Sequence, residues 1–259
     1  MNTLVFDIET VPDVDLGRRL YGLEGLADGQ IAKAMFALRR QRAGGDFLPA
    51  EQQRIVAISC ALRSGDTFRV WSLGELGSAE GELIQRFFNG IESYSPNLVS
   101  WNGAGFDLSV LTYRALLTGA HAPRFWEMGD GDDAFRYNNY LNRYHWRHTD
   151  LMDVLSGFDR RNRVSLANMA CLLGLPGKLG FDGSQVWEAW QAGDVLGIRR
   201  YCETDVLNTW LIYLRFQKLR GQLTLEQHEE ELARVRNCLS SAREPHLAEF
   251  LQAWSGGSA

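Results

Sequence analysis

The spacing of apolar and polar residues along the chain predicts a mixed α/β fold. Short runs of β-branched and aromatic residues predict strands at 4–10, 54–62, 67–73 and 96–102, with a fifth strand or strand end at 149–155. Apolar residues at helical spacing predict helices at 78–93, 107–117, 165–173, 184–190 and 194–219, then one or two helices across 224–254 and a frayed tail at 255–259. The first three strands read as an antiparallel meander, and the later strands alternate with helices. We therefore expect an α/β protein with a mixed five-stranded sheet flanked by helices.

Two segments interrupt this alternation. Residues 13–53 are polar with helical periodicity broken at Gly44-Gly45, and we expect a helical insertion after the first strand, placed to cover a site there. Residues 119–147 are aromatic, polar and irregular, so we expect a loop. The chain is then one domain over residues 1–219, followed by a helical C-terminal extension over residues 220–259.

The composition fits a chain that folds alone and without disulfide bonds. It has 259 residues, of which 45% are hydrophobic, which is enough for a sizeable core. Its four cysteines contain no CxxC pair, so neither a zinc site nor a disulfide framework is indicated. The N-terminus lacks a signal-peptide pattern, and no apolar run approaches the roughly 20 residues of a membrane helix. We expect a soluble, cytoplasmic protein with no membrane association.

The net charge restricts the classes of nucleic-acid-binding protein that fit. A formal charge of −5 argues against strong general affinity for duplex nucleic acid, which requires a basic surface. An enzyme that holds a few nucleotides at one end of a strand needs only local positive charge, so a nuclease remains compatible with this composition.

Two carboxylates stand on one face of the first predicted strand. Residues two apart on a strand point the same way, so Asp7 and Glu9 project together, with Cα atoms roughly 6.5–7 Å apart. Paired carboxylates on an otherwise apolar strand repel each other and are costly to bury, and hard divalent cations such as Mg²⁺ relieve both effects. The alternative is that both are strand-end residues facing water.

Two further acidic positions have suitable surroundings. Asp107 follows a glycine-bearing turn and begins a predicted helix, where it is either a functional carboxylate or a simple helix cap. Tyr201 and Asp205 are four residues apart and therefore share one helix face with apolar neighbours. An unpaired carboxylate buried there is costly, and a shared metal ion removes the difficulty.

Taken together, these motifs resemble a known family. Asp7-Ile8-Glu9, Asn102-x-x-x-Phe106-Asp107 and Tyr201-x-x-x-Asp205 resemble the three motifs of the DEDD 3′→5′ exonucleases, in the subgroup with tyrosine in the third motif. The most similar family is that of stand-alone bacterial proteins related to the exonuclease domain of family-B DNA polymerases, whose later segments resemble Leu175-Pro176-Gly177-Lys178 and Asp182-Gly183-Ser184-Gln185-Val186. The resemblance covers residues 1 to about 216 and implies a ribonuclease H-like fold.

The resemblance also implies two divalent ions, Mg²⁺ or Mn²⁺, and a role for each catalytic residue. Asp7 is expected to bridge both ions, while Glu9 and Asp205 hold the ion that activates water. Asp107 is expected to support the second ion, partly through water, and Tyr201 to orient the attacking water. Such ions clamp the attacking and leaving oxygens of an anionic phosphodiester.

Four residues are candidates for substrate binding. Thr10 is expected beside the terminal nucleotide, and Asn102 and Phe106 are candidates for contact with the strand. Phe106 also fits a core residue that anchors the turn. Lys178 is either a phosphate ligand or a solvated loop lysine.

Two other pairs of titratable residues are alternatives to these assignments. Asp150 and Asp153 form another acidic pair that competes for the fourth-ligand role, but only Asp205 has a tyrosine at the matching spacing. His145 and His148 invite comparison with exonucleases that use a histidine base, but neither is spaced to replace the tyrosine. We predict that both histidines are surface or loop residues.

The sequence thus predicts a metal-dependent 3′→5′ exonuclease that releases nucleoside 5′-monophosphates from single-stranded nucleic acid, with DNA favoured over RNA by the polymerase-like second motif. The alternatives are an exoribonuclease of the same fold, a catalytically silent module that binds nucleic acid or protein, and a phosphatase or nucleotidase. Residues 223–254 either pack against the core or meet a protein partner, and the sequence does not identify such a partner.

Overall fold

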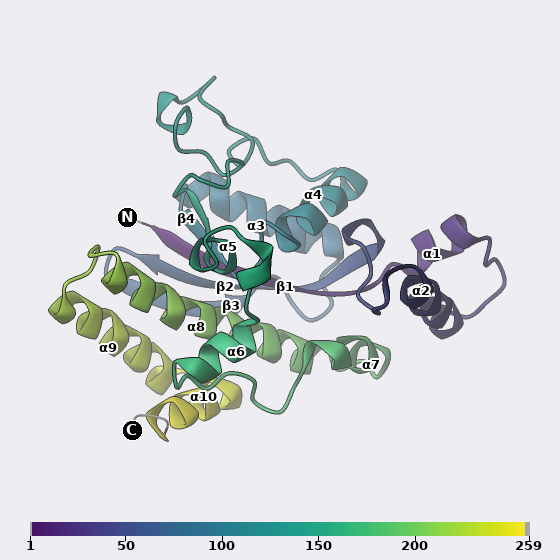
Figure 1. Cartoon of the computed structure of the whole chain (residues 1–259). Coiled ribbons are helices and arrows are strands. Elements are labelled where there is room, and N and C mark those ends of the chain that lie inside the picture. Colours follow the sequence, from purple (N-terminus) through teal and green to yellow (C-terminus); the bar gives the residue numbers. More distant parts are fainter. Residues whose placement is uncertain (1, 257–259) are drawn as a thin grey trace.

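The computed structural model describes residues 2–256 and contains a five-stranded mixed sheet (Figure 1). Its strands are β1 (Thr3–Pro12), β2 (Gln53–Ser64), β3 (Thr67–Ser72), β4 (Asn97–Ser100) and β5 (His148–Asp150). They lie in the order β3-β2-β1-β4-β5, with β1 at the centre. The first three strands pair antiparallel, whereas β4 runs parallel to both β1 and β5. The predicted mixed five-stranded α/β sheet with its antiparallel meander is confirmed.

Helices cover both faces of this sheet. They are α1 (Val14–Tyr21), α2 (Asp28–Ala43), α3 (Glu80–Tyr94), α4 (Asp107–Thr118), α5 (Leu151–Leu155), α6 (Leu166–Leu172), α7 (Val186–Gln191), α8 (Val195–Leu219), α9 (Leu225–Ser241) and α10 (Pro245–Gly256). Short 3₁₀ turns occur at η1 (Ala50–Gln52), η2 (Asp133–Phe135), η3 (Arg160–Asn162) and η4 (Gly183–Gln185). Between residues 2 and 256, no helix is both long and apolar enough to cross a membrane.

The alternation of side chains along β1 decides which face carries the acidic pair. Phe6 and Ile8 pack in the apolar cluster formed with α3 and α4, whereas Val5 packs in the cluster formed with α8. Figure 1 shows α3 and α4 on one side of the sheet and α8 on the other. Because neighbouring residues of a strand point to opposite faces, Asp7 and Glu9 project toward α8.

The long helix α8 joins the sheet to the C-terminal helices. Its second half is apolar, and Trp210 packs against Phe68 of β3 with ring centroids 5.1 Å apart. The same cluster takes in Val235 and Leu239 of α9 and Phe250 of α10, all almost fully buried. The predicted helical C-terminal extension is therefore part of the core on the α8 face, which holds α8 firmly against the sheet.

The insertion between β1 and β2 is helical, as predicted, and has a small core of its own. Ile31 and Met35 of α2 pack with Leu48, and Gly44 ends α2 in a left-handed conformation. A buried ion-pair cluster ties the root of the insertion to the main fold. Arg114 of α4 contacts Asp13 and donates to Glu80 of α3 at 2.7 Å.

Replacing Arg114 with methionine is expected to lower the free energy of unfolding by about 3–5 kcal/mol, because it leaves two buried carboxylates without their cation. Urea unfolding followed by circular dichroism measures this. Arg86→Met is the matched control, since the Arg86 pair with Glu82 is about half exposed, and it should change stability by less than about 1 kcal/mol. Equal effects of the two substitutions would contradict a stabilising role for the buried ion-pair cluster of Arg114.

The fifth strand is present but shorter than predicted, and the prediction that His148 is a surface or loop residue is wrong. The strand is only three residues long, and residues from Leu151 onward form α5. His148 belongs to this strand and is buried, with its Nε2 atom 2.8 Å from the Ser100 hydroxyl. Burial lowers the pKa of His148 to about 4, so the ring is neutral. It is a core residue rather than the predicted surface or loop residue, whereas His145 is half-buried in the adjoining loop.

Two smaller predictions also need comment. The helix predicted to begin at residue 78 begins at Glu80, and the Ser78 hydroxyl accepts from the N–H of Glu75 at 2.9 Å. The tail predicted at 255–259 lies outside the described residues from position 257 on, and Ser255 is still helical.

Candidate active site

A cleft of about 780 Å³ opens beside β1 on the face that α8 covers. All nine residues singled out in the sequence line it: Asp7, Glu9, Thr10, Asn102, Phe106, Asp107, Lys178, Tyr201 and Asp205. They come from β1, the turn before α4, the loop before α7 and the first half of α8. Residues nearly two hundred positions apart in the sequence therefore meet in one place.

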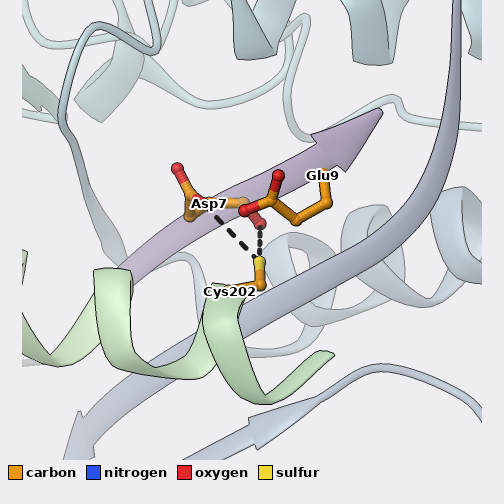
Figure 2. Close-up of side chains that lie close together, drawn as sticks. All are labelled: Asp7, Glu9 and Cys202. Atoms are coloured by element: carbon orange, nitrogen blue, oxygen red, sulfur yellow. Dashed lines mark hydrogen bonds between the residues drawn. The ribbon is translucent and has the colours of Figure 1, made fainter. Parts of the chain in front are cut away.

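Asp7 and Glu9 lie side by side along β1, above a cysteine on α8 (Figure 2). The Cys202 thiol donates to the Asp7 carbonyl oxygen at 3.4 Å and to Asp7 Oδ2 at 3.6 Å. One ligand atom from each of these three residues lies within 4.8 Å of the other two. Burial and the nearby carboxylates raise the pKa of Cys202 well above its ordinary value, so it stays a neutral thiol supporting Asp7. Sequence reasoning missed this residue, although it stands between the two members of the third motif.

Asp107 reaches the same place through the gap where two strands separate. β4 pairs with β1 only as far as Val5, so the N–H of Ile8 has no strand partner on that side. That N–H donates to Asp107 Oδ1 at 3.3 Å. Asp107 is the first residue of α4, and the bond fixes its carboxylate next to Asp7.

The turn that delivers Asp107 depends on another acidic residue. Asp150, at the end of β5, accepts from the N–H of Asn102 at 2.9 Å and from that of Ala104 at 3.0 Å. Asn102 is in the left-handed region with φ 66°, and a side chain at Gly103 or Gly105 would collide with Ser100 or Asn102, respectively. Asp150 also caps α5, so its oxygens are fully used within the fold.

The second competitor for the fourth-ligand role is occupied as well. Asp153 is buried, and its carboxylate is paired with Arg143 at 2.7 Å and with Arg163. Neither it nor Asp150 lines the cleft as the structure describes it. Of the three candidates for the fourth-ligand role, only Asp205 lines the cleft together with Asp7, Glu9 and Asp107.

Asp205 and Tyr201 lie one helical turn apart on the cleft side of α8. A hydrogen bond from the Tyr201 hydroxyl reaches the Asp205 carboxylate. The Tyr201 ring packs against Phe181, with ring centroids 5.0 Å apart, in the loop that precedes η4. Tyr201 is thereby held between α8 and this loop.

The carboxylates of the cleft are electrostatically unbalanced. Burial, and then the charges of the neighbouring carboxylates, raises the pKa of Asp7 and of Glu9 well above their ordinary values. Burial also raises the pKa of Asp107 to about 7, and that of Asp205 to about 6 despite the Tyr201 hydrogen bond and the charge of Lys178. Four carboxyl groups in one cleft therefore resist full ionisation.

The residues that line the cleft do not supply enough positive charge to balance its carboxylates. Among those the structure describes, Lys178 is the only lysine or arginine, and its ammonium is paired with Asp182 at 2.8 Å. The carboxylates that line the same cleft are those of Asp7, Glu9, Asp46, Asp107, Glu188 and Asp205. A set of oxygen donors with excess negative charge fits hard divalent cations such as Mg²⁺ or Mn²⁺ and does not suit a soft metal.

An asparagine that the sequence analysis missed anchors the loop that carries Lys178. Asn208 is fully buried on α8, where its side chain accepts from the N–H of Gly177 at 3.1 Å and donates to the Gly177 carbonyl at 3.0 Å. These two bonds fix the backbone next to Lys178. The only signal in the sequence is that Asn208 lies three residues after Asp205, on the same helix face.

A family model matches most of the chain. Residues 45–254 match the model of a family described as a predicted 3′-5′ exonuclease related to the exonuclease domain of PolB. The match spans most of the chain, so the protein belongs to this family. It reaches past residue 216, where the resemblance in the sequence ends, into α10, and it begins after Asp7 and Glu9. No curated protein matches the chain.

Among solved structures, the chain is similar to the family B DNA polymerase from the hyperthermophilic archaeon Pyrobaculum calidifontis. The two are 17% identical, with a TM-score of 0.47, and the alignment covers 97% of this chain. The chain spans only 27% of the polymerase's length.

Proposed function

We propose that the protein is a metal-dependent 3′→5′ exonuclease that removes nucleotides from single-stranded nucleic acid, DNA in preference to RNA, and releases nucleoside 5′-monophosphates. One observation carries the proposal. Four carboxylates, from Asp7, Glu9, Asp107 and Asp205, share a cleft with a single lysine, in a member of a family of predicted exonucleases.

In this proposal the four carboxylates would hold two divalent ions. Asp7 would serve both ions, Glu9 and Asp205 would hold one of them, and Asp107 would support the other. When bound, the ions supply a charge clamp for the attacking and leaving oxygens of the phosphodiester. Thr10 contacts the terminal nucleotide, Asn102 and Phe106 contact the strand, and Lys178 meets a phosphate.

Tyr201 orients the attacking water in this scheme. Burial and the neighbouring carboxylates raise the pKa of its hydroxyl above its ordinary value, so it stays protonated and is not a base. Its proton is donated to Asp205, and its oxygen accepts a hydrogen bond from the water. Its bond to Asp205 holds the hydroxyl on the cleft side of α8.

Tyr201→Phe is expected to lower kcat by about 10²-fold with little change in KM, because it removes the hydroxyl that positions the water and keeps the ring. Steady-state kinetics on a single-stranded oligonucleotide measures both constants. Tyr213→Phe, further along α8 and outside the cleft lining, is the control and should leave both unchanged. A variant that keeps its full kcat would exclude a role for the hydroxyl.

The proposed function is tested with matched DNA and RNA oligonucleotides that carry a label at the 5′ end. Purified protein should produce a ladder that shortens from the 3′ end with Mg²⁺ or Mn²⁺ and not with EDTA, faster for DNA. Faster digestion of RNA would indicate the exoribonuclease. Binding without digestion would indicate a silent module, and hydrolysis of free nucleotides alone would indicate a phosphatase or nucleotidase.

A further inference from the structure

The insertion places an exposed aromatic side chain at the mouth of the cleft. Phe47 follows α2, lines the cleft, and leaves 63% of its surface exposed. Large apolar side chains with this exposure are normally unconstrained surface residues. Phe47 instead sits on a backbone that the fold fixes on both sides.

Three contacts fix that backbone. Leu48, the next residue, is 2% exposed because it packs into the core of the insertion. Arg39 Nε donates to the Phe47 carbonyl at 2.8 Å, and the Gln53 side chain donates to the Leu48 carbonyl at 3.1 Å. The bonds come from α2 on one side and from the start of β2 on the other.

The ring of Phe47 points at the turn before α4. It contacts Phe106 with ring centroids 4.8 Å apart and planes inclined by 56°. Phe106 immediately precedes Asp107, whose carboxylate belongs to the acidic group of the cleft. The neighbouring carboxylate of Asp46 is paired with Arg40 at 2.8 Å, which reduces its repulsion of a phosphate backbone. The two rings thus form an apolar platform directly beside the carboxylates.

We propose that Phe47 is a base-stacking residue that, together with Phe106, holds the unpaired bases at the 3′ end of the strand. The proposal rests on the proposed exonuclease function and names the feature that selects its substrate. Aromatic side chains stack on every base, so the platform is tolerant of sequence. Bases in a duplex are already paired and stacked, so the platform selects single-stranded ends.

The test removes either the aromatic ring or the base. Wild-type protein should show kcat/KM about 5- to 150-fold higher for a normal strand than for the same strand with abasic residues at its 3′ end. Phe47→Ala should lose most of this preference by acting more slowly on the normal strand only, and Phe47→Trp should keep it. Leu20→Ala, an exposed apolar residue of α1 outside the cleft lining, should behave as wild type.

A binding measurement separates the stacking from the chemistry. An oligonucleotide with 2-aminopurine at its 3′ end is mixed with each protein in EDTA, and stacking is read as quenching that Phe47→Ala loses. If wild type digests nothing but shows this quenching, the exonuclease proposal fails and the stacking stands. If Phe47→Ala keeps both the wild-type preference for bases and the quenching, the stacking proposal is overturned whatever the activity.

Discussion

Replacing Asp7 with asparagine is expected to reduce phosphodiester hydrolysis by about 10³-fold or more and, at the same time, to make the metal-free protein more stable. The loss of rate follows because Asp7 lies among the other carboxylates and is the proposed bridge between two ions. The gain in stability follows because Asp7 is half-buried among like charges: its pKa is raised first by loss of solvent and then by Asp107 and Asp205. A neutral amide of the same shape removes that repulsion.

Both effects are measurable on one preparation. Activity on a single-stranded oligonucleotide with Mn²⁺ gives the first, and urea unfolding in EDTA gives the second. Asp15→Asn is the matched control, because the Asp15 side chain is 72% exposed on α1, and it should alter neither activity nor stability by much. An Asp7→Asn protein with normal activity, or with lower stability in EDTA, would contradict the role given to this carboxylate.

The stability of the metal-free protein is expected to rise as the pH falls from about 8 to about 6. Asp107 and Asp205 have folded-state pKa values of about 7 and about 6, above the ordinary aspartate value of 3.8. The folded protein therefore holds protons that the unfolded chain releases, and this stabilisation is lost as the pH rises through the folded-state values. At about pH 8 both carboxyl groups are mostly ionised, so little of this stabilisation remains.

Divalent cations should restore the stability that the metal-free protein loses at about pH 8. Mg²⁺ or Mn²⁺ is expected to raise Tm more at about pH 8 than at about pH 6, because protons compete with the ions for the same oxygens. Differential scanning fluorimetry across this range, with EDTA or with metal, measures both trends. Asp7→Asn should flatten them. A Tm in EDTA that does not change with pH, together with no response to metal at about pH 8, would exclude an unbalanced acidic site.

The parts of the fold that follow from local periodicity could be predicted from the sequence. Alternation on β1 puts Asp7 and Glu9 on one face, and the four-residue spacing of Tyr201 and Asp205 puts them on one side of α8. Each of these patterns is decided by a few neighbouring residues. The succession of strands and helices along the chain followed from the same patterns.

The remaining features depend on contacts between distant segments, which no local pattern records. Asp150 organises the turn before α4 through backbone groups 46 and 48 residues away. Asn208 fixes a glycine 31 residues away, and Cys202 supports a residue 195 positions away. His148 was misjudged because its strand is only three residues long and follows an irregular loop, so nothing local indicates that it is buried.

The most direct test of the central claim is to identify the first product released from a single DNA strand of thymidines that ends in one 3′-terminal deoxyguanosine. With Mn²⁺, the account predicts that deoxyguanosine 5′-monophosphate appears before any thymidine product, and that neither EDTA nor the Asp7→Asn protein allows its release. Thymidine products first, a nucleoside 3′-phosphate, equal release by Asp7→Asn, or no release under any metal would contradict it.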